Sequence, residues 1–111
     1  GDYSVLGMEN MVCVERKQTS DFLSYIGSER KKTTRKLTAM KDMYWKALVI
    51  ETENPFDIPD YSRMIPEHIR GNLVSICVRY GLHVYWHKDR TELERWVIDR
   101  LVKCYNVLRE V

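Results

Sequence analysis

Residues 12–21, VCVERKQTSD, place groups that could perform chemistry directly after a hydrophobic run. Residues 12–14 have the composition of a buried strand, and Glu15-Arg16-Lys17 follows without a break. Because residues i and i+2 of a strand point to the same side, Glu15 and Lys17 share one face and Arg16 points to the other. The sequence therefore predicts an acid and a base side by side where a strand ends.

The residues before this strand favour a hairpin that would bring a second carboxylate to Glu15. The segments DYSVL and MVCVERK flank GMEN, in which Gly7 and Asn10 are good turn residues. A symmetric turn would pair Leu6 with Met11, Ser4 with Cys13, and Asp2 with Glu15. Directly opposed residues have Cβ atoms about 4.5–5.5 Å apart. A turn with one residue more or fewer would shift the register and spoil this alignment.

Two carboxylates this close repel each other unless they share a proton or bind a cation. Hard oxygen ligands suit Mg²⁺ or Mn²⁺, and such sites commonly use one or two carboxylates plus substrate oxygens. Lys17 would then lie near the metal, where it could orient or deprotonate a water or stabilise charge on a phosphate. The pattern alone also allows a plain alternative, since Glu and Lys two residues apart are common on exposed strands.

A short segment further along the chain is strongly basic, although the formal net charge is only +2. Five bases occupy seven residues: Arg30, Lys31, Lys32, Arg35 and Lys36. The segment reads either as a solvated helix face or as a surface that contacts phosphates.

The composition is that of one ordinary globular domain. The 111 residues are 44% hydrophobic and 31% charged, which excludes a disordered chain. Apolar runs such as residues 47–50 are too short to span a bilayer, and no signal peptide is visible. Cys13, Cys77 and Cys104 form no CxxC pair, which favours buried free thiols in a reducing compartment over a zinc site.

Periodicity and punctuation predict the remaining elements. Helices are expected over residues 19–26, from a Ser28 cap to about Met43, from Pro66 to a stop at Gly81, and after an Asp89–Glu92 capping box. Strands are expected over residues 46–51 and 82–86, and a loop over residues 52–64. This alternation predicts an α/β sandwich in which helices flank a mixed sheet, with parallel pairing among the later strands.

The signature residues Gly1, Asp2, Glu15, Arg16, Lys17 and Asp21 resemble those of the XPF-type nuclease family: Gly-Asp, a gap, Glu-Arg-Lys, three residues and Asp. The resemblance extends along the chain. ALVIE resembles a core strand of the family, and IPEHIRGNLVSICVRYGLHVYW resembles a helix and strand near the end of its domain. The style is closest to stand-alone bacterial or phage members.

The resemblance implies a restriction-endonuclease-like fold and Mg²⁺- or Mn²⁺-dependent cleavage of DNA, often at branched or single-strand/duplex junctions. It assigns Asp2 and Glu15 to the metal and Lys17 to catalysis, with Arg16 and Asp21 completing the essential signature. For Arg16 we hypothesise a bidentate pair with a carboxylate such as Asp21. The alternative is that Asp21 only favours the helix start through the helix dipole.

The resemblance also gives the basic segment a role in DNA binding, because it follows the catalytic strand closely. Arg30, or else Lys31, would help hold DNA or the scissile phosphate, and Lys32 and Arg35 would extend that surface.

Domain organisation and partners follow from the same resemblance. We expect residues 1–111 to form a single nuclease domain that lacks an N-terminal strand and helix, which carry a further acidic residue in relatives. DNA and a second copy of the chain are the implied partners, and the implied location is cytoplasmic, or nuclear in a eukaryote. The alternatives are a non-catalytic DNA-binding or dimerisation subunit of the same family, and a structural oligomerisation module.

Overall fold

The computed structural model describes residues 2–60 and 62–110 of the chain. Its elements follow in the order β1 (Val12–Gln18), α1 (Thr19–Ile26), α2 (Arg30–Ala39), β2 (Trp45–Glu51), α3 (Pro66–Tyr80), β3 (Leu82–His87) and α4 (Arg90–Arg109). The α/β class and the positions of most elements agree with the sequence-based prediction. No helix in the described part of the chain is long and apolar enough to cross a membrane.

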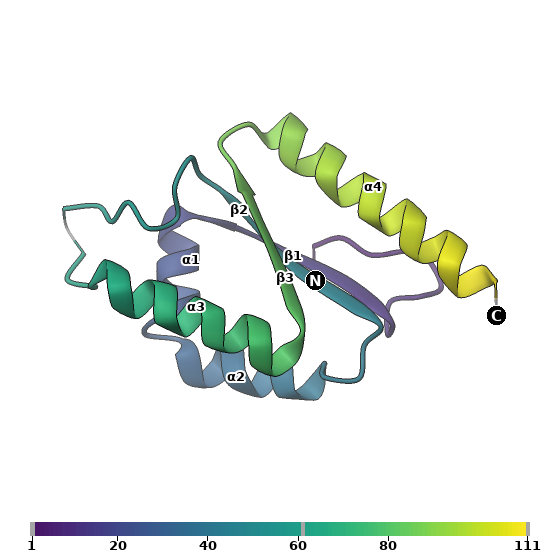
Figure 1. Ribbon diagram of the computed structural model, residues 1–111, viewed down its shortest axis with the longest axis horizontal. Helices are drawn as coiled ribbons and strands as arrows, with labels where there is room; N and C mark the ends of the chain where they lie inside the picture. Colours follow the sequence, from purple (N-terminus) through teal and green to yellow (C-terminus); the bar gives the residue numbers. More distant parts are fainter. Residues whose placement is uncertain (1, 61, 111) are drawn as a thin grey trace.

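The three strands form a parallel sheet in the order β1-β2-β3. Helices α1, α2 and α3 cover one face, and α4 covers the other (Figure 1). The larger core lies under the three helices and includes Phe22, Leu48 and Ile69. The smaller core lies under α4 and includes Val14 and Leu93. Because the strands are parallel, their carboxyl ends meet at one edge of the sheet, which is where ligands bind in many open α/β folds.

The expected N-terminal hairpin is reduced to a single antiparallel bridge, so the prediction of a strand over residues 2–6 is wrong. Tyr3 pairs with Val14, and the backbone N–H of Asp2 also donates to the Val14 carbonyl. This bridge has the predicted register, in which Asp2 lies opposite Glu15. Pairing goes no further because the chain makes two successive turns before Val12, the first of them at Gly7 with φ of 85°.

Helix α2 is shorter than predicted at both ends. Ser28 lies in the turn between the helices, and Glu29 occupies the N-cap position without a side-chain hydrogen bond. At the other end the N–H of Met40 bonds to the carbonyls of Lys36 and Leu37, which closes the last turn. The chain then enters the sheet when the Trp45 N–H bonds to Met11, so the helix cannot continue to Met43.

Proline, glycine and a capping aspartate set the boundaries of the later helices. Helix α3 has Pro66 in its first turn and ends at Gly81, whose φ of 64° is the left-handed conformation that glycine adopts most easily. Asp89 caps α4 by accepting from the Thr91 N–H, as predicted. The second half of the expected capping box is not formed, because the Asp89 N–H donates to Nδ1 of His87 instead.

The three cysteines are free, and Cys13 and Cys104 are buried. Burial raises the pKa of the Cys77 and Cys104 thiols, which lowers their thiolate fraction at neutral pH. We expect native protein to react several-fold more slowly with a disulfide reagent at pH 7 than protein unfolded in urea, and the difference to shrink as the pH rises. Equal rates in the two states would contradict this environment for the thiols.

Candidate active site

Glu15 and Lys17 project together from the carboxyl-terminal half of β1 toward α1 and α2. The Lys17 Nζ lies 3.9 Å from the Glu15 Oε1, and the side chains are 27% and 19% exposed. Both are thus partly shielded from solvent, which strengthens their electrostatic interaction. The shared face and close approach predicted from their spacing are confirmed.

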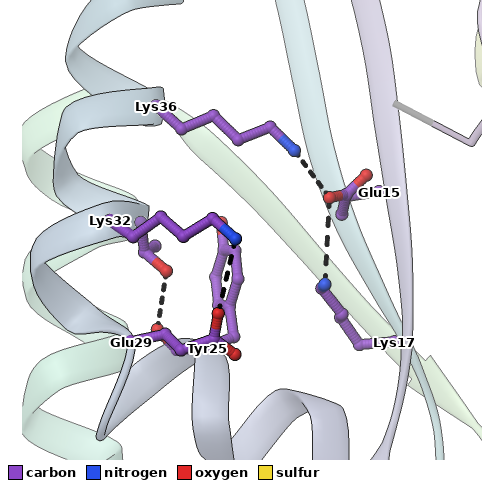
Figure 2. Close-up of a pocket in the computed structure, with 7 residues that line it drawn as sticks. Glu15, Lys17, Tyr25, Glu29, Lys32 and Lys36 are labelled. Carbon is purple, nitrogen blue, oxygen red and sulfur yellow. Dashed lines mark hydrogen bonds and ion pairs between the residues drawn. The ribbon is translucent and has the colours of Figure 1, made fainter.

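A cavity of about 140 Å³ opens between β1 and the two helices. It is lined by Glu15, Lys17, Tyr25, Glu29, Lys32, Thr33 and Lys36. Two of its lysines come from α2 and one from β1, as Figure 2 shows. A small polar cavity with three ammonium groups is suited to an anion such as a phosphate group.

Tyr25 lines this cavity, and its ring faces the Lys17 ammonium group. The Lys17 Nζ is 5.5 Å from the centroid of the Tyr25 ring, within the range of a cation–π interaction. Burial, with a smaller contribution from Glu15, raises the pKa of the Tyr25 hydroxyl. The phenol therefore stays protonated at neutral pH, and its ring serves to position the Lys17 ammonium group.

Lys36 reaches across the cavity from α2 and makes the shortest ion pair of the site. Its Nζ lies 2.7 Å from the Glu15 Oε1, the same oxygen that faces Lys17 (Figure 2). The hydrogen bond to Glu15 raises the pKa of Lys36, and the charges of Glu15 and Asp2 contribute in the same direction. Glu15 is therefore the main partner of the Lys36 ammonium group, and Asp2 contributes least.

Asp2 is exposed, and one of its carboxylate oxygens, Oδ2, accepts a 2.7 Å hydrogen bond from the Arg16 N–H. This bond ties the N-terminal segment to β1 next to Glu15. Asp2 thus lies beside β1 bound to the Arg16 N–H, while Glu15 contacts two lysines, and the described residues contain no group of three or more potential ligands. Carboxylate oxygens such as these two suit Mg²⁺ or Mn²⁺, which retain several waters and take further ligands from phosphate oxygens.

A family model described as the ERCC4 domain matches residues 1–99. The chain belongs to the ERCC4 domain family. The resemblance of its signature to XPF-type nucleases is thereby confirmed. The comparison with curated proteins gave no match.

Among solved structures, the ERCC4 domain is similar to XPF from Aeropyrum pernix in complex with DNA. The TM-score is 0.64 at 20% sequence identity, over 89% of this chain and 47% of that one. At this identity the match shows the shared fold, restriction-endonuclease-like, with a three-stranded sheet flanked by helices. This chain spans about half the length of its structural relative.

The signature arginine of the ERCC4 domain, Arg16, does not pair with Asp21. Its Nη1 lies 3.2 Å from the Oε1 of Glu51, on the α4 side of the sheet, and the same oxygen accepts from Arg90 at 3.1 Å. The pair with Asp21 is excluded because Arg16 points away from the α1 face. Asp21 is exposed in the first turn of α1, in agreement with the helix-dipole alternative.

The bases of α2 divide between two surfaces of the ERCC4 domain. Lys32 and Lys36 line the cavity beside Glu15. Arg30, Lys31 and Arg35 line a separate, open surface, and the Arg30 Nη1 bonds to Asn72 of α3 at 3.3 Å. The structure therefore does not bring Arg30 to Glu15.

Three residues of the site were not singled out from the sequence, Tyr25, Glu29 and Thr33, and Lys36 was named only as part of the basic segment. Thr33 is buried, and its hydroxyl donates to the Tyr25 carbonyl at 2.8 Å, which anchors α2 on α1. Helical spacing gives a partial signal, since Thr33 and Lys36 are three residues apart and face the same way. The pairing of Lys36 with Glu15 carries no such signal, because it depends on how α2 packs against β1.

Proposed function

We propose that this ERCC4 domain is a Mg²⁺- or Mn²⁺-dependent DNA endonuclease that hydrolyses phosphodiester bonds at branched or single-strand/duplex junctions. The observation that supports it best is the placement of Glu15 and Lys17 beside a cavity lined by the bases of α2. The relative from Aeropyrum pernix was determined in complex with DNA, which favours the same class of ligand here.

In this proposal Glu15 and Asp2 would hold a cation, and the cation would supply Lewis-acid chemistry that polarises the phosphodiester and activates a water. Lys17 lies within 4 Å of Glu15 and stabilises negative charge on the phosphate oxygens. The ring of Tyr25 keeps the Lys17 ammonium group in place through the cation–π contact. Arg16 and Asp21 have no direct contact with this chemistry, and their contribution is to the positions of β1 and α1.

The test is cleavage of a labelled set of DNAs by the purified chain: duplex, single strand, splayed arm, flap and four-way junction. We expect cuts close to the junction in Mg²⁺ or Mn²⁺ and none in EDTA. The main alternative is a non-catalytic DNA-binding or dimerisation subunit, favoured by the small donor set in the described residues. Tight junction binding without cleavage in either metal would support that alternative and contradict our proposal.

The open surface of α2 should carry part of the DNA affinity. Lys31 and Arg35 are exposed and lie four residues apart, so their replacement by alanine removes two phosphate contacts without touching the cavity. We expect weaker DNA binding and a log–log salt dependence that is about 1.8 units less steep. Fluorescence anisotropy at several salt concentrations measures both quantities.

The matched control replaces Arg95 and Lys103, two exposed bases of α4 on the opposite face of the sheet. The control changes the net charge by the same amount as the Lys31/Arg35 variant, but on α4 and not on α2. If the control lowers affinity and slope as much as the α2 variant does, DNA binding is not localised on α2.

A further inference from the structure

Lys36 makes a closer contact with the proposed metal ligand than the signature lysine does. Its Nζ lies 2.7 Å from Glu15 Oε1, and the Lys17 Nζ lies 3.9 Å from the same atom. The two lysines approach from different elements, α2 and β1, so the carboxylate bridges the helix and the strand (Figure 2). Lys36 belongs to the basic segment, but neither the family signature nor the residues individually assigned to DNA binding include it.

This contact conflicts with cation binding at the same carboxylate. Mg²⁺ binds carboxylate oxygens at about 2.1 Å, so a cation on Glu15 would lie within a few ångströms of the Lys36 ammonium. Two positive groups at that distance repel strongly in a partly shielded site, and Glu15 is only 19% exposed. The ammonium must therefore move for the cation to bind well.

The Lys36 side chain is able to move, and the neighbouring cavity has room for a DNA phosphate that would be its second partner. Its side chain is 45% exposed and has a flexible four-carbon stem. The cavity lies directly beside it, between Lys17 and Lys32. A DNA phosphate in the cavity would accept the ammonium group that Glu15 releases.

Accepting the proposed function, we propose that Lys36 is a positioning residue that competes with the cation for Glu15 and, when displaced, binds a DNA phosphate. Cation and DNA then assist each other, because each favours the arrangement in which Lys36 has left Glu15. The coupling is reciprocal, as it must be for two ligands of one protein.

The first test is Mn²⁺ affinity in the absence of DNA, measured by calorimetry or electron paramagnetic resonance. We expect Lys36→Met to bind Mn²⁺ about three- to tenfold more tightly than wild type, the range for losing a charged hydrogen bond that is half exposed. Lys36→Arg keeps the charge and should retain the wild-type affinity. If Lys36→Met is poorly folded by circular dichroism, Lys36→Gln replaces it.

Lys32→Met is the matched control. Lys32 lies one turn earlier on α2, lines the same cavity and pairs with Glu29 at 3.6 Å. The Lys32→Met variant measures the general effect of removing one positive charge near Glu15. We expect this effect to change the Mn²⁺ affinity less than twofold. If Lys36→Met binds Mn²⁺ no more tightly than Lys32→Met, the competition is wrong and the proposed function still stands.

The second test is DNA affinity with and without a cation, using Ca²⁺ after a check that it supports no cleavage. Lys36→Met should weaken junction binding in Ca²⁺ and leave it unchanged in EDTA, where wild-type Lys36 is held by Glu15. An equal loss in both conditions would make Lys36 an ordinary DNA contact and overturn the inference. If Glu15→Gln binds Mn²⁺ as well as wild type, the metal is not at Glu15, and both proposals fail.

Discussion

Replacing Glu15 by glutamine is expected to reduce DNA cleavage by at least about a hundredfold, because a metal-bound site contributes several kcal/mol to the transition state. Glutamine has nearly the same shape, so the change removes the charge and little packing. The fold should remain, since Glu15 is partly exposed and its two partners are lysines that can be solvated. Cleavage rates in Mn²⁺ and thermal unfolding together separate loss of chemistry from loss of structure.

Glu29→Gln is the control for this variant. Glu29 lines the same cavity and pairs with a lysine, yet it is the N-cap residue of α2 and not part of β1. Its replacement should leave the cleavage rate within about twofold, the scale of a screened surface ion pair. A Glu15→Gln protein that cleaves junction DNA at the wild-type rate would contradict the nuclease assignment itself.

The sequence predicted the signature strand β1 well because the information there is local. The alternation of Glu15, Arg16 and Lys17 along a strand fixes which side chains share a face, whatever the rest of the fold does. The bridge at Tyr3 and Val14 has the predicted register, although two successive turns connect its residues in place of the predicted hairpin. The boundaries of α3 follow from Pro66 and Gly81, which restrict the backbone directly.

The partners of the charged residues could not be predicted because they depend on packing between elements distant in sequence. Arg16 finds Glu51, 35 residues away, and Glu15 finds Lys36, 21 residues away. Each of these residues had a plausible neighbour nearer in the chain, such as Asp21 for Arg16. The types and faces of the site residues are therefore predictable from the sequence, whereas their partners depend on how helix α2 packs against β1.

Glu51 should matter for stability more than any exposed charge of this chain, because it joins three elements. Its Oε1 accepts from Arg16 of β1 and from Arg90 at the start of α4, and Glu51 itself ends β2. The carboxylate is 22% exposed and Arg16 is 29% exposed, so the pair is partly shielded. The Arg16 Nε is buried without a partner in the described part of the chain, which makes the remaining contact of Arg16 harder to replace.

We expect Glu51→Gln to lower the free energy of unfolding by about 1–2 kcal/mol, the range for a charged hydrogen bond with some exposure to solvent. Urea titration measures the change. The control is Glu92→Gln, whose carboxylate faces Arg95 at 3.8 Å in a far more exposed pair and should cost less than about 0.5 kcal/mol.

A double-mutant cycle then tests whether Arg16 is the partner that matters. Arg16→Met and Glu51→Met should each destabilise the protein, and together they should cost less than the sum of the two, with a coupling of about 1 kcal/mol. The cycle with Arg90→Met should give a smaller coupling, because Arg90 is 52% exposed. Additive losses for Arg16 and Glu51 would mean that the signature arginine does not stabilise the sheet through Glu51. The presence of Arg16 in the signature would then have to be explained by a role in the chemistry. Its position on the α4 face of the sheet argues against such a role.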